Sequence, residues 1–282
     1  MENLAYYNGK FGPVEEMTVP FNDRVHFFGD GVYDVTYARN HVPFALGEHI
    51  DRFYNSAALL DIRIPYEKAE LAALVQDMIN KVDSGEQFVY LQATRGTQNR
   101  AHTYPEDMKA NIWMMLRPQK VQDIFREVTA ITAEDTRFFH CNIKTLNLLP
   151  SVMYAQAAER AGVYETILYR KPDRVTECAH ANVHIINGNG EFQTAPTDNL
   201  ILPGIARAHL IKACHALGVP VRETPFTLSE LMEASEVIIS SSSAFGLHCV
   251  QINGQPVGGK APETLRAIQQ WVLDEFLAET DR

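Results

Sequence analysis

The chain has 282 residues, of which 46% are hydrophobic and 21% charged. This is the composition of an ordinary soluble protein with one large domain or two of ordinary size. The formal net charge of −10 argues against a dedicated nucleic-acid or anionic-membrane surface, because such partners select clustered lysine and arginine. The N-terminus lacks a charged head followed by an apolar core, and no stretch approaches the roughly 20 apolar residues that span a bilayer. We therefore expect a cytosolic protein.

Two helices are predicted in the first half of the chain. Apolar residues recur at helical spacing over residues 48–60 and again over 68–82, so each segment has one apolar face. Arg52 lies on the first of these helices.

Strands are predicted at residues 88–94 and 112–116, where β-branched, aromatic and large apolar residues dominate. The polar, proline-bearing stretch 117–123 is typical of a linker between domains. The expected organisation is an N-terminal α/β domain at 1–118, a linker at 119–123 and a C-terminal domain with Lys144 at 124–282.

The second half alternates strands with helices. Asn147 is expected to cap a helix that Gly162 ends, and Thr227 with Glu230 forms a capping box. A hairpin is expected through residues 187–190. The expected strands are 128–132, 165–170, 181–187 and 236–240, and the expected helices are 147–161, 205–217 and an amphipathic one near the C-terminus.

The cysteines are widely spaced and include no Cys-x-x-Cys pair. This spacing indicates neither a zinc knuckle nor a compact disulfide framework. We expect reduced, mostly buried thiols at Cys141, Cys178, Cys214 and Cys249.

Lys144 lies between an apolar, strand-like run and the helix expected from residue 147. A lysine whose amine is partly desolvated loses part of its preference for the charged form, so it can condense with an aldehyde as a Schiff base. The alternative is a lysine whose stem simply covers an apolar surface. Glu177 is open to two interpretations as well, a solvated turn residue or a carboxylate that keeps a pyridine nitrogen protonated.

Three segments offer the groups that bind phosphate, namely a guanidinium, backbone N–H groups at a helix start, and hydroxyls. They are Arg52, residues 203–206, and the pair Ser241 and Ser242. Each could also be a surface residue, a turn or a flexible loop.

The polar loop at 95–105 contains Arg100 and His102, which with Tyr33 offer a charge and directional donors for a carboxylate. The same pair could be an ordinary solvated surface feature. His180 and His184 fall on a strand-like segment with no evident third ligand, so no metal site is expected. The glycines before Tyr33 lack the strand-then-helix setting of a dinucleotide site.

The order of these motifs resembles that of the fold-type IV pyridoxal-phosphate aminotransferases, and most closely that of the D-amino-acid transaminases. The resemblance covers nearly the whole chain. It is carried by Gly29-Asp-Gly-Val-Tyr33, Glu48-His-Ile-Asp-Arg52, Thr94-Arg-Gly-Thr with Arg100-Ala-His102, Asn142-Ile-Lys-Thr-Leu-Asn147, Thr176-Glu177, Leu202-Pro-Gly-Ile205 and the run Ser240 to Ser243.

The resemblance implies an α+β fold of two domains, a smaller N-terminal α/β domain and a larger, barrel-like C-terminal domain, with pyridoxal 5′-phosphate between them. It implies that Lys144 holds the cofactor and carries the proton to and from the substrate, and that Glu177 pairs with the pyridine nitrogen. It assigns the phosphate to Arg52, Ile205, Ala206, Ser241 and Ser242, the ring to Leu202, and the substrate carboxylate to Tyr33, Arg100 and His102.

The implied reaction moves the amino group of a D-amino acid, D-alanine being the expected donor, to 2-oxoglutarate, giving pyruvate and D-glutamate. In this family the loop with Arg100 typically reaches across a homodimer interface, so a second copy of the chain is the expected partner. The alternatives are a 4-amino-4-deoxychorismate lyase or a branched-chain L-aminotransferase of the same fold, and a protein that only binds the cofactor.

The sequence departs from the family pattern at several positions. Ala206 stands where threonine is common, which removes one hydroxyl from the phosphate site. Asp34 replaces the more usual glutamate, and residues 178–181 replace a run rich in glycine and serine, where His180 could stand in for a serine. These departures bear on the substrate range rather than on Lys144 or Glu177.

Overall fold

The computed structural model describes residues 1–281, which fold into two compact units. The first unit contains Met1–Val121, Ile143–Asn147 and the residues from Phe276 onward. The second contains Gln122–Asn142 and Leu148–Glu275. Neither unit is a single continuous piece of chain, and Lys144 belongs to the first.

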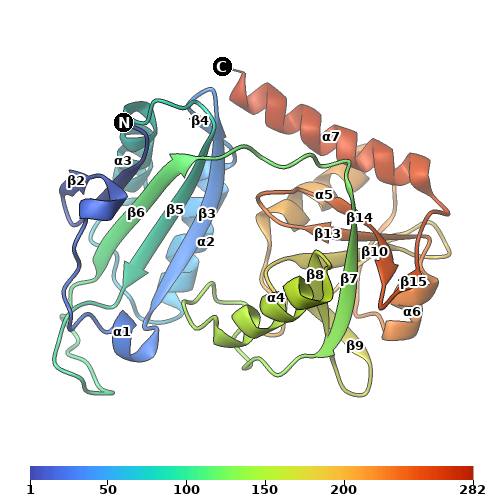
Figure 1. Ribbon diagram of the computed structural model, residues 1–282, viewed down its shortest axis with the longest axis horizontal. Helices are drawn as coiled ribbons and strands as arrows, with labels where there is room; N and C mark the ends of the chain where they lie inside the picture. The colour runs from blue at the N-terminus through green and yellow to red at the C-terminus, as the bar shows by residue number, and fades with distance from the viewer. Residues whose placement is uncertain (282) are drawn as a thin grey trace. The chain divides into compact units, whose positions relative to one another are not determined.

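The first unit is a six-stranded antiparallel sheet in the order β2-β1-β6-β5-β3-β4, with α2 and α3 against one face (Figure 1). Its elements are β1 (Leu4–Tyr7), β2 (Lys10–Gly12), η1 (Val14–Glu16), α1 (Val25–Phe28), β3 (Gly31–Arg39), β4 (Val42–Pro43), α2 (Leu46–Ala58), α3 (Lys68–Lys81), β5 (Gln87–Thr94) and β6 (Asn111–Pro118).

The core of the first unit lies between this sheet and its helices. Phe53 and Ala57 of α2, one turn apart, are almost fully buried together with Val89 and Leu91 of β5. The alternation along β5 sends these side chains to the helix face. Replacement of Phe53 by alanine would cost about 3–5 kcal/mol of stability.

Residues Ile143–Asn147 extend the first sheet at the edge of β3. Thr145 forms a bridge with Val32, the Leu146 N–H donates to the Gly31 carbonyl (3.0 Å), and the Tyr33 N–H donates to the Lys144 carbonyl (3.0 Å). A Cβ atom at Gly31 would lie 2.6 Å from the Ala93 carbonyl oxygen, so only glycine permits this close approach. The backbone of Lys144 is thus fixed on the sheet.

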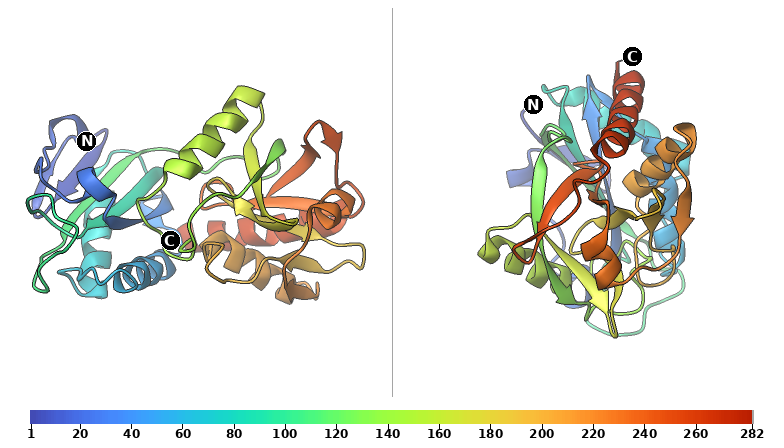
Figure 2. Two further views of the ribbon diagram at one scale, coloured as in Figure 1. Left: turned by 90° about the horizontal axis from the view of Figure 1, so that it is seen from below. Right: turned by 90° about the vertical axis from the view of Figure 1, so that its right-hand side faces the viewer.

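The second unit is built on nine strands in the order β12-β11-β10-β13-β14-β7-β8-β9, with β15 beside β14. The Cys178 N–H at the end of β9 donates to the Ala181 carbonyl before β10 (2.7 Å), and the sheet curls into a half-barrel, in agreement with the barrel-like domain that the resemblance implies. Helix α4 lies on one side of the sheet and α5 on the other (Figures 1 and 2). The elements are β7 (Glu127–Glu134), α4 (Leu149–Ala161), β8 (Glu165–Arg170), β9 (Arg174–Cys178), β10 (Asn182–Ile186), β11 (Phe192–Thr194), α5 (Ile205–Ala216), β12 (Val221–Glu223), α6 (Leu228–Glu233), β13 (Glu236–Ser240), β14 (Leu247–Ile252), β15 (Gln255–Pro256) and α7 (Pro262–Thr280).

One predicted helix cap is wrong. Asn147 does not cap α4, whose N-cap is Leu148 without a side-chain hydrogen bond. The Asn147 amide instead donates to the Gly29 carbonyl (3.0 Å) and to the Thr145 hydroxyl (2.8 Å). The left-handed Gly162 and the capping box of Thr227 are confirmed.

The four cysteines are free thiols. Burial raises the pKa of Cys141 to about 11 and the pKa values of Cys214 and Cys249 to about 12, and it raises that of Cys178 well above the ordinary value. They therefore remain protonated and weakly nucleophilic. In residues 1–281 no helix has both the length and the apolar character needed to cross a membrane.

Candidate active site

The amine of Lys144 lies over an aromatic ring in the first unit. Its Nζ atom is 4.3 Å from the centroid of Tyr33, and the Tyr33 ring stacks on Tyr90 with a centroid distance of 5.6 Å. The Lys144 N–H donates to the hydroxyl of Ser56 on α2 (3.2 Å). Both the backbone and the amine of this lysine are therefore held by neighbours, as a reactive group requires.

Arg52 is part of a buried ion pair on the helix-covered side of β3. Its Nε and Nη2 atoms donate to the two carboxylate oxygens of Asp34 at 2.8 and 2.7 Å. Burial alone would raise the pKa of Asp34, but the Arg52 charge and a hydrogen bond with His49 hold it well below its ordinary value. Arg52 therefore presents a guanidinium of fixed orientation.

His49 completes this group as a neutral imidazole. Its Nδ1 atom lies 2.7 Å from the Asp34 carboxylate, and burial lowers its pKa although Asp34 opposes that effect. Because Asp34 is ionised, we infer that Nδ1 carries the proton. Asp34, which the sequence marked only as a departure, is thus the shared acceptor of Arg52 and His49.

Arg100 and His102 lie together on the exposed loop that follows β5. The Arg100 guanidinium is 5.2 Å from the ring centroid of Phe28, and the His102 ring is 5.1 Å from the same ring. Among residues 1–281 neither forms a hydrogen bond or ring contact with Tyr33, the third predicted carboxylate ligand. Within one chain, two of these three residues are therefore brought together.

Glu177, at the end of β9 in the second unit, has three donors for its carboxylate. Arg137 donates to one oxygen, while the Asn182 amide (2.9 Å) and the Leu202 N–H (3.0 Å) donate to the other. Burial raises the pKa of Glu177, and the Arg137 charge and the Leu202 N–H oppose the rise. Such a buried carboxylate is well suited to bind a protonated ring nitrogen.

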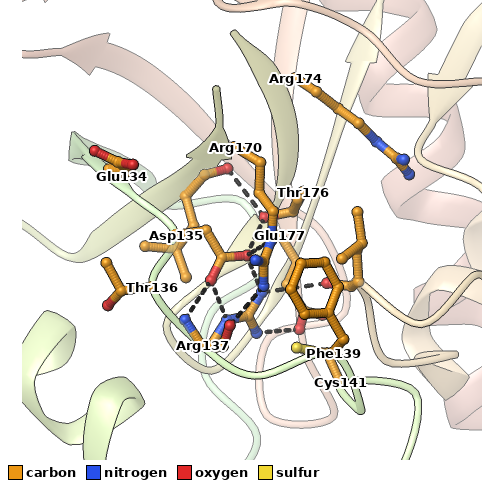
Figure 3. Close-up of polar contacts among 12 residues, drawn as sticks. Glu134, Asp135, Thr136, Arg137, Phe139, Cys141, Arg170, Arg174, Thr176 and Glu177 are labelled. Carbon is orange, nitrogen blue, oxygen red and sulfur yellow. Dashed lines mark hydrogen bonds and ion pairs between the residues drawn. The ribbon is translucent and has the colours of Figure 1, made fainter. Parts of the chain in front are cut away.

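Arg137 is itself fixed by Asp135, two residues earlier. The Asp135 carboxylate accepts hydrogen bonds from the Arg137 N–H, Nε and Nη2 atoms at 2.9–3.0 Å, and from the Thr176 hydroxyl at 3.0 Å (Figure 3). Arg170 adds a second guanidinium, with its Nε atom 3.5 Å from Asp135. Glu177 is therefore part of a network of four charged residues, three of which are buried.

The start of helix α5 leaves backbone N–H groups for an anion. Gly204 is its N-cap and provides no side-chain cap, so the first-turn N–H groups at Ile205 and Ala206 have no partner within the helix. A Cβ atom at Gly204 would lie 2.1 Å from Oδ1 of Asn182, whose amide nitrogen also donates to the Leu202 carbonyl (3.1 Å). A side chain at residue 204 would therefore displace the Asn182 amide, the partner of Glu177.

The serine run follows directly from β13. Ser241 and Ser243 share a hydrogen bond of 3.1 Å between their hydroxyls, and Ser242, like both of them, is half-buried. Ser240, the last residue of β13, lies 2.7 Å from Nε2 of the fully buried His184. The segment that carries these hydroxyls therefore starts at a strand end that is fixed by a hydrogen bond.

The two histidines of the possible metal pair point to different partners. His184 bonds Ser240 and the Thr194 hydroxyl (2.8 Å), whereas His180 pairs with the buried carboxylate of Glu165 (3.0 Å). No group of three or more possible metal ligands is present within residues 1–281.

Sequence reasoning missed several supporting residues. Arg137 lies in the same stretch as Lys144, yet nothing in its spacing pointed to Glu177, 40 residues away. The available signal was the opposite charges of Asp135 and Arg137, two residues apart between the strand-like run 128–133 and Phe138, because charges beside buried segments require partners. Asn182 offered no signal of its own.

The chain is similar to proteins of a known family. Residues 31–252 match the family Amino-transferase class IV. A D-alanine aminotransferase of Listeria monocytogenes is 40% identical over 270 residues, which cover 93% of this chain and 92% of the relative. A D-alanine aminotransferase of Bacillus licheniformis is 36% identical over 279 residues and 97% of both chains.

The fold has solved counterparts. The branched-chain amino acid aminotransferase from Escherichia coli superposes with a TM-score of 0.87 at 24% identity, over 99% of this chain and 96% of that one. At this identity the likeness concerns the fold alone. With the family match and the sequence relatives, it shows that the chain belongs to the class IV aminotransferases, which are pyridoxal-phosphate-dependent enzymes.

Proposed function

We propose that the protein transfers the amino group of a D-amino acid, D-alanine in the first place, to 2-oxoglutarate, with pyruvate and D-glutamate as products. The observation that carries the proposal is the identity of 34–40% to D-alanine aminotransferases over nearly the whole chain. The Arg100 and His102 pair on one loop supports it, because two adjacent donors suit an α-carboxylate.

The residues present fit pyridoxal 5′-phosphate by the chemistry of their donors. The first unit offers the amine of Lys144 and the guanidinium of Arg52, and the second offers the Glu177 carboxylate and hydroxyl and N–H donors for a phosphate. When bound, the cofactor supplies an aldehyde that an amine can join and a ring that withdraws electrons from the substrate α-carbon.

Each residue then has a defined task. Lys144 would hold the cofactor through its amine, and its Nζ atom would accept the proton from the substrate α-carbon and donate a proton in the next step of the transfer. Glu177 keeps the ring nitrogen protonated. Arg52, the N–H groups at Ile205 and Ala206, and the hydroxyls of Ser241 and Ser242 bind the phosphate, while Leu202 packs on the ring.

The substrate carboxylate is assigned to Tyr33, Arg100 and His102. Ala206 cannot provide the hydroxyl that a threonine would, so the backbone N–H groups and the serines bear more of the phosphate binding. The missing hydrogen bond corresponds to about 1 kcal/mol.

We also propose a homodimer in the cytosol. Helix α4 exposes Leu149, Val152 and Met153 at 71%, 59% and 65%, with the spacing of one helix face. A contiguous exposed apolar face of this kind is typical of an interface. Light scattering after size exclusion should give twice the 31.7 kDa chain mass, and Val152→Glu should shift the protein toward the monomer.

The reaction itself is tested with paired enantiomers. D- and L-alanine and D- and L-leucine are each offered with 2-oxoglutarate, and the oxo acid and the configuration of the glutamate are measured. We expect pyruvate and D-glutamate from D-alanine only. Turnover of L-leucine without D-alanine, or pyruvate release that needs no oxo-acid acceptor, contradicts the proposal.

The role of Lys144 has an independent test. Borohydride reduction of the holoenzyme followed by peptide mapping should place a pyridoxyl group on residue 144, and Lys144→Ala should abolish turnover. A label on another lysine, or full turnover by Lys144→Ala, contradicts this assignment.

A further inference from the structure

The loop that carries Arg100 and His102 is held by an arginine outside the assigned site. Arg24, only 3% exposed, directs its guanidinium at the backbone of this loop. Its Nη1 atom donates to the Ala101 carbonyl at 2.6 Å and to the Thr103 carbonyl at 3.3 Å, and Nη2 donates to the His102 carbonyl at 3.2 Å. Three consecutive carbonyl groups thus share one side chain.

Asp30 fixes the orientation of Arg24. Its carboxylate accepts the Arg24 Nε atom at 2.6 Å and the Arg95 Nε atom at 2.9 and 3.0 Å. Arg95 also donates to the Leu60 carbonyl (2.8 Å) and lies 3.7 Å from the centroid of Tyr104. One carboxylate therefore joins the start of the loop, through Arg95, to the residues that follow Arg100.

Phe28, which ends α1, is the apolar surface beneath these groups. Arg24, Arg100 and His102 all lie 5.0–5.2 Å from its ring. Residues 99–107 are exposed and belong to no helix or strand, so no hydrogen-bond ladder fixes their conformation. Two side chains fix it instead: the guanidinium of Arg24, whose planar fork reaches several acceptors at once, and the Gln98 amide, which donates to the Thr103 carbonyl (2.8 Å) and the Ala101 carbonyl (3.5 Å).

We propose that Arg24 is a positioning residue for substrate recognition: by binding the carbonyl groups of residues 101–103 it sets the positions of the Arg100 and His102 side chains that receive the substrate carboxylate. The inference rests on the proposed function. Arg24 touches neither the amine of Lys144 nor the partners of Glu177, so its loss weakens substrate binding and leaves cofactor binding intact.

The test compares Arg24→Lys and Arg24→Gln with Arg63→Gln, which removes an exposed arginine of the same unit. KM and kcat are measured with an amino acid that the wild type turns over, and cofactor affinity is measured by equilibrium dialysis. For both Arg24 variants we expect KM to rise roughly 10- to 100-fold, as for a misplaced binding group. Cofactor affinity and kcat should change far less, and Arg63→Gln should resemble the wild type.

A second readout does not depend on activity. Loss of the Arg24 contacts should release residues 99–107, so trypsin should cleave after Arg100 faster in the Arg24 variants than in the wild type or Arg63→Gln, with unchanged far-ultraviolet circular dichroism. Arg24→Lys keeps a charge beside Asp30 but cannot span the three carbonyl groups. If Arg24→Gln does not fold, KM and tryptic cleavage of Arg24→Lys alone test the inference.

Unchanged KM and unchanged cleavage in a folded Arg24 variant overturn the inference. A rise in KM accompanied by equally large losses of kcat and cofactor affinity also overturns it, because such a result indicates a general structural role. If the wild type has no activity toward D-amino acids but the Arg24 variants still expose Arg100 to trypsin, the proposed substrate fails while the role of Arg24 in the loop stands.

Discussion

Buried charges in the second unit are held in pairs, which matters because an isolated charge cannot be kept in a protein interior. Asp135 is fully buried, and Arg137 and Glu177 nearly so. Burial would lower the pKa of Arg137, but its bonds with Asp135 and the Glu177 charge raise it. The network fixes the carboxylate that we assign to the ring nitrogen.

Replacement of Arg137 by methionine should therefore strongly destabilise the folded protein. Two carboxylates would lose their shared guanidinium inside the protein, and we expect a loss of about 3–5 kcal/mol in the free energy of unfolding. Arg174→Met is the matched control, since Arg174 pairs with Asp198 at a half-exposed position and such pairs contribute about 0–1 kcal/mol. Urea unfolding of both variants measures the difference. Equal losses would contradict the buried network.

His184 should make stability depend on pH. Burial, and secondarily the Arg207 charge, lowers its pKa to about 3, against about 6.5 for an exposed histidine. Below pH 6.5 the unfolded chain binds a proton that the folded chain refuses, so stability falls as the pH falls from 6.5 toward 3. The expected loss from this residue between pH 7 and 5 is about 2 kcal/mol.

Urea unfolding at several pH values tests this expectation. His184→Gln keeps hydrogen-bonding atoms near Thr194 and Ser240 but cannot titrate, so its unfolding free energy should fall less between pH 7 and 5 than that of the wild type. Identical pH profiles for the two proteins would rule out the neutral buried imidazole.

At the scale of elements, local patterns in the sequence were a good guide where apolar residues recur at helical spacing or form a continuous run. The helix expected at 68–82 is α3 (Lys68–Lys81), and the strand expected at 236–240 is β13. The strands β3 and β9 were not predicted. β3 begins with Gly31 and contains the buried Asp34, and β9 is short and polar, so neither shows clean alternation.

The supporting residues of the site could not be predicted for a related reason. The motifs around Arg52 and Glu177 were visible in the sequence, but their partners come from other elements. Asp34 reaches Arg52 from β3, and Arg137 reaches Glu177 from the segment after β7. Such pairings depend on strand order, which no local pattern contains.

Gly204 gives a prediction at this scale. In Gly204→Ala the new Cβ atom would lie 2.1 Å from Oδ1 of Asn182, so Asn182 must move away from Glu177 and Leu202. We expect at least a tenfold loss of cofactor affinity, about 1.4 kcal/mol. Gly188→Ala, where nothing lies within 4 Å, is the control. Fluorescence titration with the cofactor compares them, and equal affinities would contradict the tight turn.

At the scale of the whole molecule, the two units share the chain in an interleaved order. The end of α7 belongs to the first unit, where Phe276 packs edge-on against Phe44 at 5.3 Å and Glu279 accepts the Ala45 N–H (2.9 Å). These contacts close the turn that precedes α2. The first unit is therefore incomplete without residues that follow the entire second unit in the sequence.

Phe276→Ala tests this dependence. Phe276 is 4% exposed, and its truncation should lower stability by about 3–5 kcal/mol. Amide exchange should then quicken in α2 and β4 more than in the second-unit strands. Leu217→Ala, at a partly exposed apolar residue, is the control, and it should leave stability and the amide exchange of α2 and β4 unchanged. Faster exchange confined to the second unit would contradict the assignment of the end of α7 to the first unit.

The interleaving also bears on how the protein is made. Domains generally fold from the N-terminus as they leave the ribosome, yet the segment Ile143–Asn147 emerges only after the six strands it joins, and Phe276 emerges later still. A nascent first unit must wait for both pieces. Newly synthesised chains should therefore acquire their vitamin B6 cofactor only after residue 276 has left the ribosome.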